Sequence, residues 1–144
     1  RSLLQILEAE NLLMDAGDMH YIARWITPLG SPRRFDARFF IARVPRAQTP
    51  AHDNQELVHS AWFRPQDVLD AFDREEMVLM TPTLRMVRSL ARFGSAEEVI
   101  AAAESNLSDE RVRVVDGRLV LPGDPGYEDA DQNIENGWVR LRPQ

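Results

Sequence analysis

Four arginines gather around a Gly/Pro-containing turn near the middle of the N-terminal half: Arg24, Arg33, Arg34 and Arg38. A guanidinium group binds phosphate oxygens through two parallel hydrogen bonds, a geometry that lysine does not offer. The cluster therefore predicts a site for an anionic ligand. The alternative is a solvated face on which these arginines pair with some of the 23 acidic residues of the chain, for example with Asp36.

Aromatic side chains interleave with these arginines: Tyr21, Trp25, Phe35, Phe39 and Phe40. Such rings could form a wall on which a base or an acyl chain packs. Aromatic residues at strand spacing more often belong to the core, which is the interpretation for Trp25, Phe35 and Phe39. Phe40 falls on the same strand face as Arg34 and Arg38 and is the ring that we expect to contact a ligand.

Glu56 is the carboxylate with the strongest claim to a chemical role. It opens a predicted strand, and a strand end can hold a metal ligand or a general base rigidly. The alternative is that it caps the preceding loop or pairs with an arginine. The three histidines lack the spacing of a zinc site, and neither a Gly-rich phosphate loop nor a GxSxG motif occurs. Nucleophilic catalysis has no support.

Two strands must position the arginines. Residues 19–26 and 35–44 alternate in polarity, and the turn between them is long enough for an antiparallel hairpin with an open loop. Strict alternation in the first strand places Tyr21, Ala23 and Trp25 on one face. The opposite face then carries Ile22, Arg24 and Ile26.

The remaining elements are predicted from local signals. An amphipathic helix starts after Ser2, and residues 55–63 read as a third strand. Three helices follow, opened by Pro65, by Pro82 and by the capping box of Ser95 and Glu98.

The tail contains the strongest hairpin signal, two alternating runs around Asp116-Gly117, followed by an irregular acidic stretch. The order of elements predicts an α+β fold. We expect residues 1–93 to form one body, with residues 94–144 packed on it as a helix, a β-hairpin and an acidic tail.

Composition restricts the partners. A chain of 144 residues fits one domain, and a formal charge of -6 argues against nucleic acid or an anionic membrane as the main partner. There is no cysteine, and no apolar run approaches the roughly 18 residues of a membrane span. These observations predict a soluble, cytoplasmic protein in which any site for an anion is local.

Three blocks in order carry a family resemblance: Ala23–Phe40, Glu56–Pro65 with Trp62, and Thr81–Leu84. Together they resemble the part of Nudix hydrolases that follows the catalytic motif, in the branch related to acyl-coenzyme A diphosphatases, and the match covers residues 2–93. The resemblance implies a Nudix-like α/β/α sandwich with a mixed sheet, incomplete in this chain, with the C-terminal hairpin as an extension.

The Nudix box itself, Gly-x5-Glu-x7-Arg-Glu-x2-Glu-Glu-x-Gly, does not occur in the sequence. In the family its glutamates hold Mg²⁺ or Mn²⁺, which neutralises the diphosphate and activates a water. The box would lie upstream of Arg1, so we expect the chain to be a fragment. A missing N-terminal segment or a second copy, forming a homodimer, would cover the open side of the sheet.

For the residues present, the resemblance implies that Arg24, Arg33, Arg34, Arg38 and Phe40 face the substrate and that Glu56 serves as a catalytic carboxylate or metal ligand. The parent protein would cleave the diphosphate linkage of a coenzyme A-like nucleotide derivative. Whether this chain is itself an enzyme stays open, and the alternative is a catalytically inactive Nudix-like module for nucleotide binding or assembly.

Overall fold

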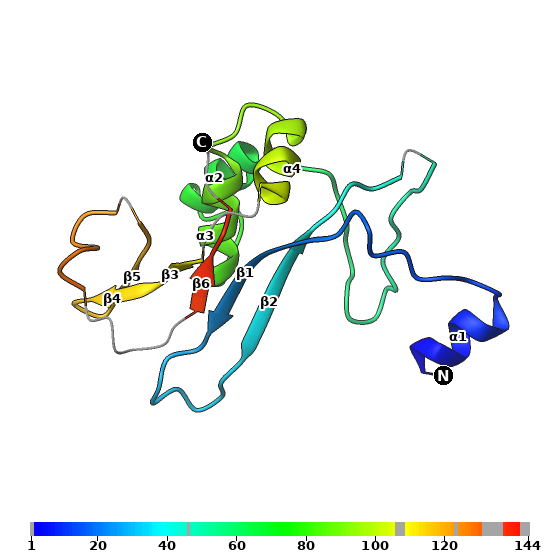
Figure 1. Ribbon diagram of the computed structural model, residues 1–144, viewed down its shortest axis with the longest axis horizontal. Helices are drawn as coiled ribbons and strands as arrows, with labels where there is room; N and C mark the ends of the chain where they lie inside the picture. The colour runs from blue at the N-terminus through cyan, green and yellow to red at the C-terminus, as the bar shows by residue number, and fades with distance from the viewer. Residues whose placement is uncertain (1, 46, 106–108, 123, 131–136, 142–144) are drawn as a thin grey trace.

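Helices and two small antiparallel sheets make up the computed structural model, which describes residues 2–45, 47–105, 109–122, 124–130 and 137–141 (Figure 1). The helices are α1 (Leu3–Ala9), α2 (Pro65–Asp73), α3 (Thr81–Leu90) and α4 (Ala96–Glu104). The strands are β1 (His20–Ile26), β2 (Asp36–Ile41), β3 (Glu110–Arg111), β4 (Arg113–Val115), β5 (Arg118–Val120) and β6 (Gly137–Val139). The predicted α+β class is confirmed.

The larger sheet has the strand order β2-β1-β6-β3, and the second sheet is the β4-β5 hairpin. Every pairing among the described residues is antiparallel, so the parallel component of the expected mixed sheet does not occur among them. β6, from the tail, pairs with β1 and with β3 and so lies inside the sheet. Residues 94–144 thus contribute strands to the same sheet as residues 1–93.

β6 approaches β1 very closely at Gly137. This glycine has a φ of 112° and lies opposite Trp25 in the register. A Cβ atom at this position would overlap the carbonyl oxygen of Arg24. Only glycine fits both the backbone conformation and the space.

The predicted hairpin of β1 and β2 is confirmed, but it contains a β-bulge. Tyr21 lies opposite Phe40 and Ala23 lies opposite Phe39, so Ile22 is an extra residue in β1. A bulge interrupts the alternation of side chains between the two faces. The expected assignment of faces is therefore wrong before Ala23: Ile22 is buried, and Tyr21 shares the face of Phe40 and Arg24.

One face of the larger sheet forms the core with α3 and α4. Its buried members are Ile22, Ala23, Trp25, Met86, Val99, Ala102, Val112, Val139 and Leu141. Phe39 packs against this cluster, as predicted for a core ring. Phe35 does not, because it precedes β2 and is 57% exposed.

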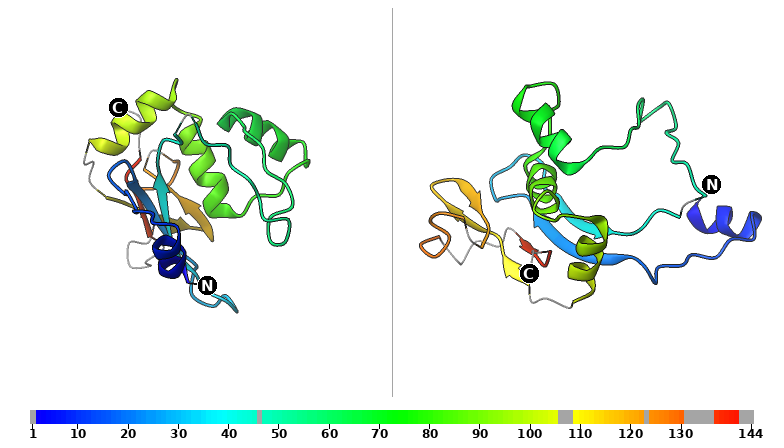
Figure 2. Two further views of the ribbon diagram at one scale, coloured as in Figure 1. Left: turned by 90° about the vertical axis from the view of Figure 1, so that its right-hand side faces the viewer. Right: turned by 90° about the horizontal axis from the view of Figure 1, so that it is seen from above.

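The predicted strand at residues 55–63 is wrong, since these residues form bends and irregular loop. The carboxylate of Asp53 accepts hydrogen bonds from the backbone amides of Gln55 at 3.1 Å and Leu57 at 2.9 Å. These side-chain bonds turn the backbone and compete with strand pairing. In Figure 2 these residues belong to a wide arch, residues 47–64, which leads to α2.

Two predictions from local sequence motifs are confirmed, the helix capped by Ser95 and the hairpin at Asp116-Gly117. The Ser95 hydroxyl accepts from the amide of Glu98 at 3.2 Å at the start of α4. Asp116 and Gly117 have φ values of 47° and 73°, the left-handed pair that a type I′ turn between β4 and β5 requires.

The chain exposes much more surface than a compact protein of its mass. Its accessible area is 11094 Å², whereas a compact 16.5 kDa monomer exposes about 7,600 Å². Two segments contribute to this excess. One is α1, which buries no residue and lies far from α2, α3 and α4, and the other is the arch before α2 (Figures 1 and 2). Apolar side chains are exposed on both segments, including Leu4 of α1 at 70% and Trp62 of the arch at 73%.

None of the helices in the described part of the chain has the length and apolar character needed to cross a membrane.

Candidate functional site

The sheet face opposite α3 and α4 carries alternating cations and rings, which we call the aromatic–arginine face. Its members are Tyr21, Arg24, Arg38, Phe40, Trp138 and Arg140. The register explains the grouping: Arg24 lies opposite both Arg38 and Trp138, and Tyr21 lies opposite Phe40. Because residues directly opposite in antiparallel strands project to the same side, these side chains share one surface.

Arg24 is held by an acidic neighbour. Its Nε and Nη2 atoms donate to the two carboxylate oxygens of Asp36 at 2.8 Å and 3.0 Å. Arg38 lies 3.8 Å from the same carboxylate. The sequence left open that the arginines pair with Asp36. Arg24 does so through two hydrogen bonds, and Arg38 does so through one longer contact.

Asp36 is tuned by these cations. The hydrogen bond from Arg24 and the positive charges of Arg24 and Arg38 lower the pKa of Asp36 below its usual value of 3.8. A carboxyl group whose pKa is lowered by folding stabilises the fold above its unfolded pKa. That contribution is lost as the pH falls through the lowered value, so Asp36 remains ionised and paired at neutral pH.

Arg34 and Arg33 lie outside the aromatic–arginine face, at the hairpin connection. Arg34 Nε donates to the carbonyl oxygen of Thr27 at 2.9 Å, and the Thr27 hydroxyl accepts from the amide of Phe35 at 3.0 Å. Arg34 therefore helps to close the hairpin. Arg33 is exposed in the same turn.

The rings of the aromatic–arginine face contact one another. Phe40 stacks on Tyr21 with a centroid distance of 5.1 Å and an interplanar angle of 28°. Trp138 meets the Tyr21 ring edge-on at 4.6 Å. Phe40 remains 52% exposed despite the stacking. The structure thus brings the predicted residues Arg24, Arg38 and Phe40 together and adds Tyr21.

Trp138 and Arg140 were not predicted. The guanidinium of Arg140 lies over Trp138 at 4.9 Å and over Tyr21 at 5.6 Å, and its Nε donates to Asp109 at 2.6 Å. The sequence did contain a short strand pattern here, because Trp138 and Arg140 alternate with the aliphatic residues Val139 and Leu141, which are buried in the structure. Four residues of alternation were too few to separate a strand from the acidic stretch before it.

Glu56 is not brought to this face. It is exposed in the loop before α2, and its backbone amide donates to the Asp53 carboxylate at 3.4 Å. Amide hydrogen bonds, chiefly those of Leu57 and Gln55, lower the pKa of Asp53. Within the described residues no three histidine, aspartate or glutamate side chains are arranged to hold a metal ion. A catalytic role for Glu56 stays a prediction.

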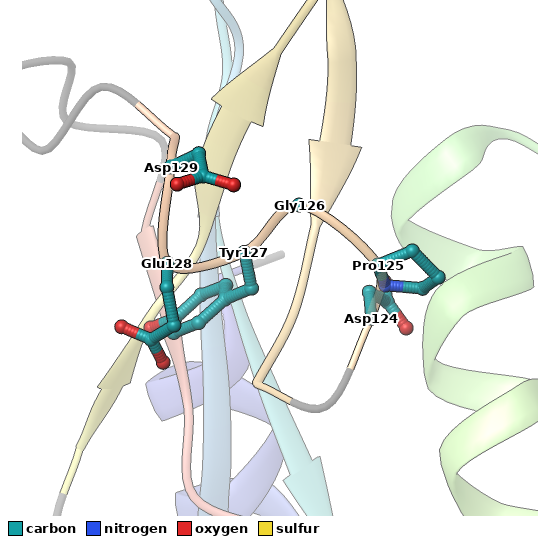
Figure 3. Close-up of a pocket in the computed structure, with 6 residues that line it drawn as sticks. All are labelled: Asp124, Pro125, Gly126, Tyr127, Glu128 and Asp129. Carbon is teal, nitrogen blue, oxygen red and sulfur yellow. The ribbon is translucent and has the colours of Figure 1, made fainter.

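A surface hollow that shares no lining residue with the aromatic–arginine face is lined by Asp124, Pro125, Gly126, Tyr127, Glu128 and Asp129 (Figure 3). Its acids repel phosphate, and two of them form ion pairs: Arg85 with Asp124 at 3.1 Å and Arg113 with Glu128 at 3.5 Å. The Tyr127 ring packs under Arg113 at 3.9 Å, and its hydroxyl donates to the Arg111 carbonyl. These contacts fasten the tail to the fold.

A second hollow is lined by Pro50, Ser60, Ala61 and Trp62, in the arch before α2. His52 Nδ1 lies 3.0 Å from the Ser60 hydroxyl. A nucleophilic site would also need an acid that orients this histidine, and the contacts found for His52 in the described structure include none. The aromatic–arginine face is therefore the better candidate, and its chemistry is binding: cations for phosphate and rings for a planar or apolar group.

Asp36 competes with any anion for Arg24 and Arg38. We expect Asp36→Asn to tighten the binding of inorganic pyrophosphate roughly fivefold, because one negative charge close to the ligand is removed. Isothermal titration calorimetry at neutral pH measures the effect. Asp73→Asn, an exposed change on α2 with the same effect on net charge, is the control and should leave the affinity unaltered. Equal affinities for both variants would contradict the site.

The same pair gives a pH dependence. Unfolding by urea should show wild type more stable than Asp36→Asn at neutral pH, and the difference should disappear as the pH falls below 3.8.

Comparison with known proteins relates the chain to one group. It is similar to the protein named acyl-coenzyme A diphosphatase NUDT19 from Homo sapiens, with 28% identity over 132 residues, which is 85% of this chain and 35% of that protein. It is similar to the protein of the same name from Gallus gallus, with 26% identity over 146 residues, or 92% of this chain and 39% of that protein. The chain thus spans little more than a third of the length of these relatives.

No protein-family model matches the chain, and no solved structure matches it significantly. The expected relationship to the acyl-coenzyme A diphosphatases of the Nudix family is confirmed as homology at low identity over most of the chain.

Proposed function

We propose that this chain is the substrate-positioning part of a Nudix-type hydrolase that cleaves a diphosphate linkage in a nucleotide derivative such as coenzyme A. The observation that carries the proposal is the similarity to two acyl-coenzyme A diphosphatases over 85% and 92% of the chain. Clustering of Arg24, Arg38 and Phe40 on one sheet face supports it, since these groups suit a ligand with phosphates and a ring.

The reaction adds one water to a P–O–P bridge. The water oxygen bonds to one phosphorus, the bridging P–O bond breaks, and the products are two phosphate monoesters. The proposed task of Arg24 and Arg38 is to hold the diphosphate oxygens, and Arg33 and Arg34 at the hairpin turn add positive charge nearby. Such donors orient the phosphorus for attack and stabilise the charge that develops on its oxygens.

A divalent metal, Mg²⁺ or Mn²⁺, is expected by relationship to the family, but the described residues do not suit it. No three metal-binding side chains converge among them, and Glu56 is exposed on a loop. No step through a metal is assigned to this chain. The proposal places the metal-binding glutamates in a further segment of the protein. This segment would also cover α1 and the arch before α2, and the large exposed area of the chain supports such a cover.

The second candidate is a Nudix-like module that binds a nucleotide or mediates assembly without catalysis. It is favoured by one observation, the lack of a metal-binding cluster among the described residues. A homodimer that buries the exposed apolar side chains would suit this role.

The test compares the 144-residue chain with a protein extended upstream of Arg1 by the flanking coding sequence. We expect the extended protein to hydrolyse coenzyme A in Mg²⁺ and the 144-residue chain to show no turnover. In the extended protein, Arg38→Ala should lower kcat/KM by roughly tenfold or more, because a charge-assisted hydrogen bond to phosphate is lost.

Arg88→Ala, an exposed arginine of α3, is the matched control and should keep full activity. Calorimetry with coenzyme A, ADP-ribose and NADH, with and without Mg²⁺, separates the two candidates. Binding without turnover in the extended protein would reject the hydrolase and favour the module.

A further inference from the structure

We propose that the aromatic–arginine face takes the purine end of a nucleoside diphosphate, with the base stacked on Phe40 and the phosphates on Arg38. The inference rests on the proposed function for its choice of a nucleotide ligand, and it adds which part of that ligand lies where. It also gives roles to Tyr21, Trp138 and Arg140, which would hold the Phe40 ring in place on the side opposite the bound base.

Phe40 has the properties of a stacking surface. It is the outermost ring of the three, on the edge strand β2, and 52% of it is exposed. Arg38 lies two residues away on the same strand face, so its guanidinium is within reach of phosphates attached through a ribose. A base stacked on one ring with its phosphate on a neighbouring cation is a general solution for nucleotide binding.

The support behind Phe40 is already formed. Tyr21 stacks on Phe40 at 5.1 Å, Trp138 contacts Tyr21 at 4.6 Å, and Arg140 lies over both Trp138 and Tyr21. Asp109 fixes Arg140 in place. Because these side chains are ordered by contacts within the protein, little further ordering is needed when a ligand arrives.

The charge of the face matches a small polyanion. Three of its members are arginines, Arg24, Arg38 and Arg140, and Arg111 lies next to the face, opposite Trp138 in the register. Asp36 forms an ion pair with Arg24, and Asp109 forms one with Arg140. A local excess of positive charge on a chain with a net charge of -6 suits a short anion, whereas a long nucleic acid would be repelled by the rest of the surface.

The experiment uses calorimetry on the 144-residue chain with three probes: ADP, adenosine and inorganic pyrophosphate. We expect ADP to bind more tightly than either adenosine or pyrophosphate. Phe40→Ala should weaken ADP about tenfold, a typical loss for one base–aromatic stack, and leave pyrophosphate unchanged. Phe40→Tyr keeps an aromatic ring and should keep the ADP affinity, whereas unchanged pyrophosphate binding by Phe40→Ala excludes a purely structural effect of the position.

Phe35→Ala is the matched control. Phe35 belongs to the same hairpin and is 57% exposed, but it lies outside the aromatic–arginine face. Its replacement should affect neither ADP nor pyrophosphate. The inference is overturned if Phe40→Ala and Phe35→Ala behave alike, if ADP binds no better than pyrophosphate, or if a single-stranded RNA oligomer binds more tightly than ADP.

Failure of this inference is distinguishable from failure of the proposed function. Coenzyme A hydrolysis by the extended protein, with kcat/KM unaffected by Phe40→Ala and no ADP binding, would sink the stacking site alone. ADP binding that depends on Phe40, in an extended protein that hydrolyses nothing, would sink the hydrolase alone.

Discussion

Replacing Gly137 by alanine is expected to cost at least about 3 kcal/mol of unfolding free energy. The added methyl group would overlap the Arg24 carbonyl oxygen, a backbone atom that cannot move without displacing β1. The φ of 112° at this position adds strain for any residue with a side chain. Urea unfolding monitored by far-ultraviolet circular dichroism measures the loss.

Gly30→Ala separates strain from overlap. Gly30 also has a positive φ, of 91°, but nothing lies within 4 Å of the place where its Cβ would be. Its replacement should cost only about 1 kcal/mol, the strain alone. Equal losses for the two variants would mean that β6 does not approach β1 as described.

Trp25→Ala is expected to destabilise the fold by about 3–5 kcal/mol, the usual cost of removing a large aromatic ring from a core. Trp25 is 3% exposed and packs with residues of α3, α4 and β6 in the main core cluster. A loss below about 1 kcal/mol would show that helices and sheet are not packed around this ring. Thermal unfolding with a ligand-free sample provides the measurement.

Trp25→Phe is the informative companion. The indole Nε1 of Trp25 is buried and has no hydrogen-bond partner within the described structure. Burying an unpaired donor costs about 1–3 kcal/mol, so its removal offsets part of the lost packing. We expect Trp25→Phe to cost no more than about 1–2 kcal/mol, well below the alanine variant.

Elements with a local chemical signal could be predicted from the sequence. Asp116-Gly117 fixes its hairpin because few other residues adopt two consecutive left-handed conformations, and Ser95 fixes the start of α4 by capping it. These features depend on neighbours a few residues away. Their prediction needs no knowledge of the tertiary fold.

The candidate site was predicted only in part, for a physical reason. The bulge at Ile22 depends on how β1 pairs with its neighbours, and it alone moves Tyr21 onto the face of Phe40. Trp138 of β6 and the nearby Arg140 join from more than 100 positions along the chain, which no local pattern reveals. Residues 55–63 are apolar enough to predict a strand, but the Asp53 carboxylate binds the backbone amide of Leu57 and turns the chain there.

The position of β6 inside the sheet has a consequence for folding during translation. β1 and β2 are adjacent in the chain and can pair early, yet the other edge of β1 finds its partner only when residues 137–141 have been made. Until then the nascent hairpin offers a bare row of amides and carbonyls to any neighbouring chain. Synthesis from the N-terminus therefore leaves a period in which the nascent hairpin can misassemble, and a translation product that ends before β6 would keep this edge unpaired.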